Sequence, residues 1–265
     1  PERFIDVGIS EADMVSTAAG MAATGLIPFC NSFAMFITSI CYLPVRIQIA
    51  YPSLPVKLIG SSAGLTQGPD GASHQSLEDI ALMRIMLNMA VVSPADDVET
   101  RLATFAVADW PGPVYMRLGR YPVPRLFNGA YRFEMGKAAT LRGGGDVALF
   151  ATGHMVCKAL EAADLLAQKR VEAAVIDVST IKPLDEAAIL RTIGMSSRQL
   201  LWRHLRRLSL GGIAAALLGA LFGWGLQLGL SHWLGGELGA NLPAAGWRPL
   251  PAAAGHAALL LLGFA

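Results

Sequence analysis

The chain has 265 residues, enough for one large or two ordinary domains, and 53% of them are hydrophobic while only 15% are charged. Residues 187–265 contain six arginines, no lysine and one acid, Glu237, which leaves 15 basic and 19 acidic residues in the part before them. The net charge of +1 is therefore the sum of two parts with opposite charge. The sequence has no basic run interleaved with aromatics, so nucleic-acid binding is not expected. Its three cysteines are too few and too irregularly spaced for a disulfide scaffold or a metal site.

The first elements alternate between strand and helix patterns. A short strand is expected at residues 4–7, and the run SEAD resembles a capping box in which Ser10 is the cap and Asp13 replaces the usual Glu or Gln. A helix of small residues follows and ends at Gly25, and an apolar strand and an interrupted helix come after it. A buried strand then leads into a glycine-rich loop at residues 60–71.

The alternation continues with a helix in SLEDIALMRIML, a strand in MAVVSPAD, a helix with Asp96 or Asp97 near its start, and a strand in GPVYMRLGR. This order predicts an α/β fold class for residues 1–120, with a mostly parallel sheet and helices on both faces. Residues 121–131 indicate a linker, and residues 132–190 a truncated second α/β domain of two strands and one helix.

The last part of the chain has a different composition. Residues 208–230 contain only two polar side chains, Ser209 and Gln227, which is typical of a transmembrane helix; a buried core helix is the alternative. Several arginines precede this run, which predicts a cytoplasmic location for residues 1–207. A partial second span is expected at residues 252–265.

Four motifs give residues 1–190 a resemblance to a known family. The runs are PERFIDVGISEADMVSTAAGMAATGLIPFCNSFAMF, GLTQGPDGASHQSLEDIALMR, GPVYMRLGR and STIKPLD. In this order they resemble the C-terminal half of transketolase, and above all the separate C-terminal subunit of split transketolases. The resemblance implies a pyrimidine-binding domain for thiamine diphosphate at residues 1–120, and an enzyme component for ketol transfer between sugar phosphates.

The resemblance also implies a partner. The GDG motif that holds Mg²⁺ and the diphosphate is absent from the sequence, so the resemblance places these groups on an N-terminal subunit, in a homodimer or a heterotetramer. The chain is expected to be a fragment that is inactive alone, because the first strand and helix of the pyrimidine-binding domain are missing.

Three residues match positions near the cofactor in the family. Glu11 matches the glutamate that hydrogen-bonds N1′ of the pyrimidine and exchanges a proton with it, and is therefore the expected catalytic and cofactor-binding residue. Its alternative role is a favourable charge at a helix start. Phe33 and Phe36 match the aromatics beside the pyrimidine ring, with ordinary core packing as the alternative.

Further residues match substrate positions. His74 matches the active-site histidine that binds substrate oxygens and transfers protons. Asp70 matches an acid that contacts sugar hydroxyls, or is a solvated turn residue, and Arg117 matches an arginine for the substrate phosphate, or is a surface charge. Ser62 stands where the family usually has a histidine for the sugar phosphate, which leaves the sugar substrate open.

The tail resembles a second family. The run AILRTIGMSSRQLL and the apolar residues after it resemble permease subunits of ABC exporters of the lipoprotein-release and cell-division type. Residues 191–265 are therefore expected to be a permease-like tail that meets the enzyme part at residues 188–191 in a chimeric or mis-joined chain. The alternatives are a membrane-anchored or permease-related protein, a generic anchor, and a chimera without function.

Overall fold

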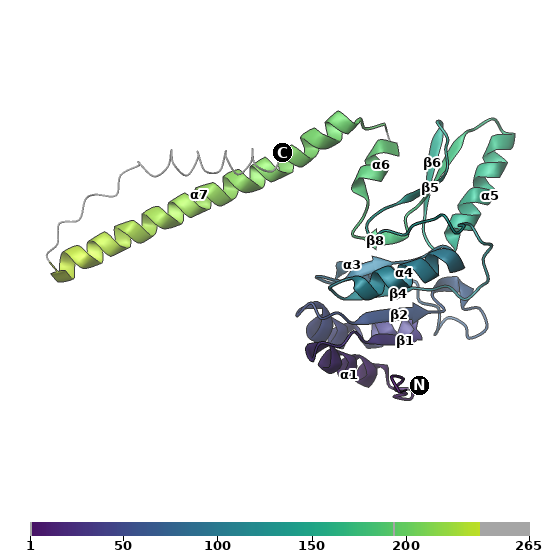
Figure 1. Ribbon diagram of the computed structural model, residues 1–265, viewed down its shortest axis with the longest axis horizontal. Coiled ribbons are helices and arrows are strands. Elements are labelled where there is room, and N and C mark those ends of the chain that lie inside the picture. Colours follow the sequence, from purple (N-terminus) through teal and green to yellow (C-terminus); the bar gives the residue numbers. More distant parts are fainter. Residues whose placement is uncertain (1, 193, 239–265) are drawn as a thin grey trace. The chain divides into compact units, whose positions relative to one another are not determined.

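The structure is a computed structural model that describes residues 2–192 and 194–238. The chain forms two compact units, Pro1–Ile193 and Gly194–Ala265. The first unit contains two sheets, and the described part of the second is one long helix, α7 (Ser197–Leu238) (Figure 1).

The larger sheet has five strands in the order β1-β2-β4-β3-β8. β1, β2, β4 and β3 are parallel to their neighbours, and β8 is antiparallel to β3. The mostly parallel sheet predicted from the apolar runs is thereby confirmed. The bounds of the strands are β1 (Phe29–Phe33), β2 (Lys57–Ser61), β3 (Ala90–Val92), β4 (Val114–Arg117) and β8 (Thr180–Lys182).

Helices pack on this sheet. The core beside β1 and β2 joins small residues of α1, such as Val15 and Ala18, to Ile37, Ile49 and Leu58, so the small side chains let the helix approach closely. The interrupted helix predicted after β1 consists of two π-helical segments around one α-helical turn. The helical elements are α1 (Glu11–Ala23), η1 (Phe36–Ile40), α2 (Tyr42–Pro44), η2 (Val45–Ala50), η3 (Gly64–Thr66), α3 (Asp79–Ile85) and α4 (Asp97–Asp109).

Two local predictions near the N-terminus are wrong. Residues 4–7 form no strand, because none of the described strands pairs with them, and Phe4 and Ile5 are exposed. Ser10 precedes α1, but its side chain makes no capping hydrogen bond. Asp96, one of the two acids noted near the start of α4, does cap its helix, because its side chain accepts a hydrogen bond from the Glu99 N–H.

The smaller sheet has the order β5-β7-β6, with β5 antiparallel and β6 parallel to β7. The sequence predicted only two strands and one helix here; it missed β5, which is short and carries the polar residues Thr140 and Arg142. It also missed that β8 leaves this sheet to pair with β3 of the larger one. The elements are β5 (Ala139–Arg142), β6 (Val147–Ala151), α5 (Met155–Gln168), β7 (Ala173–Asp177) and α6 (Glu186–Thr192).

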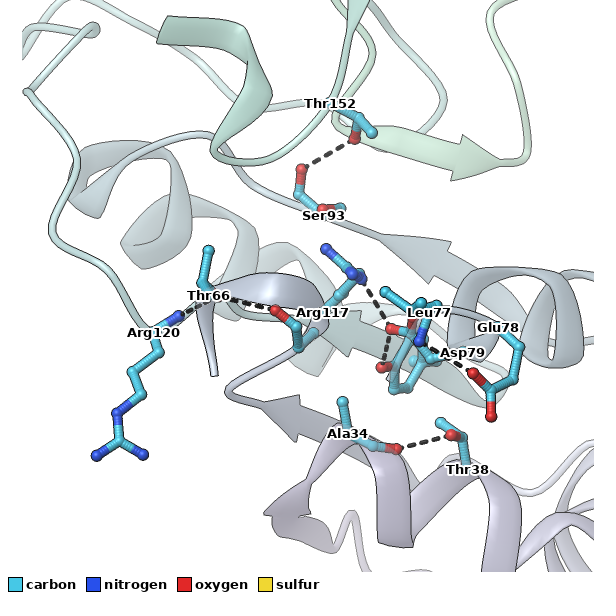
Figure 2. A network of polar contacts seen from close by, with 12 residues as sticks. Ala34, Thr38, Thr66, Leu77, Glu78, Asp79, Ser93, Arg117, Arg120 and Thr152 are labelled. Atoms are coloured by element: carbon cyan, nitrogen blue, oxygen red, sulfur yellow. Dashed lines mark hydrogen bonds and ion pairs between the residues drawn. The ribbon is translucent and has the colours of Figure 1, made fainter. Parts of the chain in front are cut away.

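Hydrogen bonds join the two sheets within the first unit. The Ser93 N–H donates to the Ser179 carbonyl at 2.7 Å, and Thr152 Oγ1 donates to the Ser93 carbonyl at 3.3 Å (Figure 2). Because Ser93 directly follows β3, these contacts fix the smaller sheet to the end of the larger one.

The helix α7 contains the segment predicted to cross a membrane. Gly212–Leu230 has a mean hydropathy of 1.7, and none of it is buried, so by length and composition it is long and apolar enough to span a bilayer. The second span predicted at residues 252–265 lies outside the described residues.

Candidate active site

Three of the predicted site residues pack together by their rings. The Phe36 and His74 centroids lie 5.0 Å apart at 73°, and Phe33 meets Phe36 at 5.8 Å and His74 at 5.5 Å, both nearly perpendicular. Edge-to-face contacts of this kind are favourable because the positive ring edge meets the negative face. All three side chains are partly exposed, so they form a wall that a flat ligand can reach rather than a closed core.

Glu11 begins α1 and lies next to β1. Its Oε1 accepts a hydrogen bond from Ser32 Oγ at 2.8 Å, and Ser32 directly precedes Phe33. Burial, and after it the charge of nearby Glu11, raises the pKa of Cys41, which follows η1, to about 11. The Glu11 carboxylate at the start of α1 thus lies close to β1, the strand that carries Phe33 of the aromatic wall.

The site lies at the carboxyl ends of parallel strands. β1 ends at Phe33, β2 ends at Ser61 and β4 ends at Arg117. Ligands of open α/β sheets bind at this edge. Ser62, which follows β2, has a φ of 56°, so the chain turns sharply at the position where the family usually carries histidine.

Arg117 forms an ion pair with the buried acid Asp79. Its Nε donates to Asp79 Oδ2 at 2.8 Å, the same oxygen that Tyr115 Oη contacts at 2.7 Å, and its side chain is only 13% exposed (Figure 2). Burial and the charge of Asp79 raise the pKa of Tyr115, so this hydroxyl stays a donor. The Arg117 charge therefore compensates Asp79, and its role toward a substrate phosphate stays a prediction.

Arg120 is a second arginine near the end of β4, and the sequence motifs did not single it out. Its Nη1 lies 3.3 Å from Asp70 Oδ2 and 2.7 Å from Gln67 Oε1, and its side chain is 43% exposed. Figure 2 shows its side chain extending away from Arg117 and Asp79. The signal for Arg120 was present in the sequence, since it follows the end of β4 by three residues in the same run, YMRLGR.

Comparison with known proteins decides the family. The family model described as "Transketolase, pyrimidine binding domain" matches residues 1–124, and "Transketolase, C-terminal domain" matches residues 136–226. An apulose-4-phosphate transketolase subunit of Phocaeicola vulgatus is 37% identical over 220 residues, which are 82% of this chain and 70% of that protein. The chain belongs to the transketolase family.

Other relatives are longer than this transketolase chain. The 6-deoxy-6-sulfo-D-fructose transketolase subunit SqwH of Clostridium sp. is 44% identical over 192 residues, 72% of this chain and 60% of that protein. The chain spans about 60% of the length of several such relatives. A split-gene transketolase solved as an inactive beta4 tetramer has a TM-score of 0.68 and 41% identity over 72% of this chain and 62% of that one.

The comparisons do not support a permease segment. The transketolase C-terminal model extends to residue 226 and therefore crosses the junction expected at residues 188–191. Neither a permease origin for the tail nor a chimeric chain receives support from these findings.

The residues of this candidate site are chemically suited to one end of thiamine diphosphate, the cofactor that the family implies. In the part of the chain that the structure describes, Ser32 is the only hydrogen-bond donor to the Glu11 carboxylate, and it contacts Oε1 alone. Glu11 Oε2 can therefore accept from or exchange a proton with a ring nitrogen, next to aromatic rings that suit a flat heterocycle.

Proposed function

We propose that this chain is the C-terminal component of a thiamine diphosphate-dependent transketolase that transfers a ketol group between sugar phosphates. The observation that carries the proposal is the convergence of Glu11 with Phe33, Phe36 and His74 at the carboxyl edge of the larger sheet. A helix-start glutamate and two core phenylalanines would not need this half-exposed arrangement beside a histidine.

The side chains have separate tasks in this proposal. Bound thiamine diphosphate supplies the nucleophilic carbon and the electron sink for the reaction. Glu11 exchanges a proton with the pyrimidine nitrogen N1′, and Phe33 and Phe36 orient the ring and exclude water from it. His74, whose ring packs edge-to-face with both phenylalanines, binds the substrate oxygen and accepts or donates its proton.

The substrate contacts involve Asp70, Arg117 and Arg120. Asp70 is half-exposed on the glycine-rich loop, where its carboxylate can accept from sugar hydroxyls after leaving Arg120. Arg120 is the better candidate for a substrate phosphate, because Arg117 already neutralises buried Asp79. Ser62 supplies a neutral hydroxyl where the family usually has an imidazole. This difference favours a sugar that does not require a positively charged protein group at this position.

The partner in this proposal is an N-terminal subunit with the diphosphate-binding domain and its Mg²⁺. Two relatives are called transketolase subunits, and the related split-gene transketolase structure is described as an inactive tetramer of one subunit. By analogy, this chain assembles as a homodimer or in a heterotetramer and is inactive without the partner. Its residues 1–120 form the pyrimidine-binding domain and residues 132–190 the C-terminal domain, with a linker at residues 121–131.

Reconstitution tests the enzyme proposal. The chain is mixed with a split-transketolase N-terminal subunit, thiamine diphosphate and Mg²⁺, and ketol transfer is followed with a panel of sugar phosphates. Activity is expected only in the mixture, and Glu11→Ala is expected to abolish it. Full activity of Glu11→Ala, after circular dichroism shows an unchanged fold, would contradict the site.

The tail supports an additional proposal, that α7 anchors the chain in a membrane while residues 1–207 stay in the cytoplasm. Gly212–Leu230 is apolar and unburied, and Arg198 and Arg203 precede it on the side predicted to be cytoplasmic. Retention of the full chain in the membrane pellet after carbonate extraction is expected, and release of the chain into the supernatant would contradict an anchor.

A further inference from the structure

Ser32 is a hydroxyl residue within the site to which no role has been given so far. It is partly buried on β1, and its Oγ donates to Glu11 Oε1 at 2.8 Å. The two residues are 21 positions apart and belong to different elements, so the contact is not a by-product of local helix geometry. No other donor contacts the Glu11 carboxylate among the residues that the structure describes.

The backbone of Ser32 is itself fixed to the neighbouring strand. Ser61 Oγ donates to the Ser32 carbonyl at 3.0 Å, in addition to the parallel ladder in which Ser32 lies opposite Gly60. The Ser32 hydroxyl therefore starts from a backbone position that has little freedom to move. A donor held in this way can restrict the rotamer of the acceptor that it contacts.

We infer that Ser32 is a positioning residue for Glu11, holding Oε1 so that Oε2 faces the pyrimidine ring of the cofactor. This inference rests on the proposed function. With the cofactor bound, Glu11 Oε2 would share one proton with N1′, giving it up and taking it back, so no proton or electron would be gained or lost overall. Ser32 donates throughout and does not itself transfer the proton.

The test uses the full chain reconstituted with an N-terminal subunit, thiamine diphosphate and Mg²⁺. At saturating cofactor, Ser32→Ala is expected to slow deuterium exchange at the cofactor C2 by about 10- to 100-fold, a part of the usual effect of acid–base catalysis. Ser32→Thr, which keeps the hydroxyl, is expected to restore the rate. Ser16→Ala is the matched control, because the Ser16 hydroxyl donates only to the Ala12 carbonyl within α1.

A double-mutant cycle separates positioning from a general structural role. If Ser32 acts through Glu11, adding Ser32→Ala to Glu11→Gln changes the exchange rate no further. An equal slowing in both backgrounds would overturn the inference. For the full chain without partner or cofactor, the shifts in Tm caused by the two substitutions are expected to be less than additive, and strict additivity would count against the contact.

The outcomes also distinguish the two proposals. If Glu11→Gln slows exchange but Ser32→Ala does not, the positioning role of Ser32 is wrong and the proposed function stands. If Glu11→Gln exchanges at the rate of the unmodified chain, the proposed role of Glu11 is wrong, and the positioning role falls with it.

Discussion

The carboxyl of Asp177 holds a proton at neutral pH. Replacing it with a side chain that is neutral without taking up a proton is expected to stabilise the fold at that pH. Asp177 ends β7, and both of its oxygens are buried without a hydrogen bond from any donor among the described residues. Both oxygens of the adjacent Glu99 already accept, from Tyr131 Oη at 2.6 Å and the Ala95 N–H at 2.8 Å. Asp177 can therefore pair with Glu99 only by donating its own proton.

The size of the effect follows from the pKa. Burial, and after it the charges of Glu99 and Asp96, raises the pKa of Asp177 from 3.8 to about 9. Because the folded chain binds a proton that the unfolded chain releases, this contribution is complete below pH 3.8 and is lost as the pH rises to 9. The unfolding free energy should fall by about 1.4 kcal/mol per pH unit in this window, or on the order of 4 kcal/mol by pH 7.

Asp177→Asn tests this reasoning. The amide has nearly the same size and can donate to Glu99 without taking up a proton, so the variant should be more stable than the unmodified chain at pH 7, by up to about 4 kcal/mol. Urea unfolding of the full chain is followed by circular dichroism from pH 5 to 8. In the variant, the unfolding free energy should fall less steeply with pH, by the amount that corresponds to about one proton.

The matched control for Asp177→Asn is Asp146→Asn. Asp146 is an exposed carboxylate at the opposite end of the same sheet, where it accepts from the Glu172 N–H at 2.8 Å. The control should keep the pH slope of the unmodified chain. An unchanged slope in Asp177→Asn, or a loss of stability at pH 7, would refute the shared proton.

Three other predictions concern buried groups. Burial lowers the pKa of Lys57 to about 8, so the unfolding free energy should rise with pH between 8 and 10.5, and Lys57→Met should remove this rise in urea titrations. Arg117→Ala should cost about 3–5 kcal/mol of stability, because it leaves Asp79 buried without its cation, and thermal unfolding measures this loss. Gly60→Ala should cost about 1–3 kcal/mol in the same assay, because its Cβ would clash with the ring and the hydroxyl of buried Tyr115.

Much of the fold was predictable because its strands are locally distinct. The runs that form β2 and β4 are apolar and bounded by turn residues, so their burial follows from composition alone. β5 was not predictable in this way, because a short polar strand is formed by pairing with β7 rather than by its own composition. The same holds for β8, whose partner β3 lies about 90 residues earlier in the chain.

The candidate site shows the same division between local and distant information. Family motifs were sufficient to select Phe33, Phe36 and His74, and the structure brings their rings together. Motifs could not show that Arg117 forms a buried ion pair, because its partner Asp79 is 38 residues away in sequence.

Arg117 and Arg120 lie in the same motif but have different environments, because one is the last residue of β4 and the other follows it. Only two residues separate these arginines in sequence, yet one side chain is 13% exposed and pairs with a buried carboxylate, while the other is 43% exposed and pairs with an acid on the glycine-rich loop. A buried cation that lost its acid to a ligand would leave Asp79 uncompensated, whereas Arg120 can exchange Asp70 for a phosphate in solvent at little cost. An anion bound at this strand end would therefore be held at lower cost by the arginine that follows the strand than by the one that ends it.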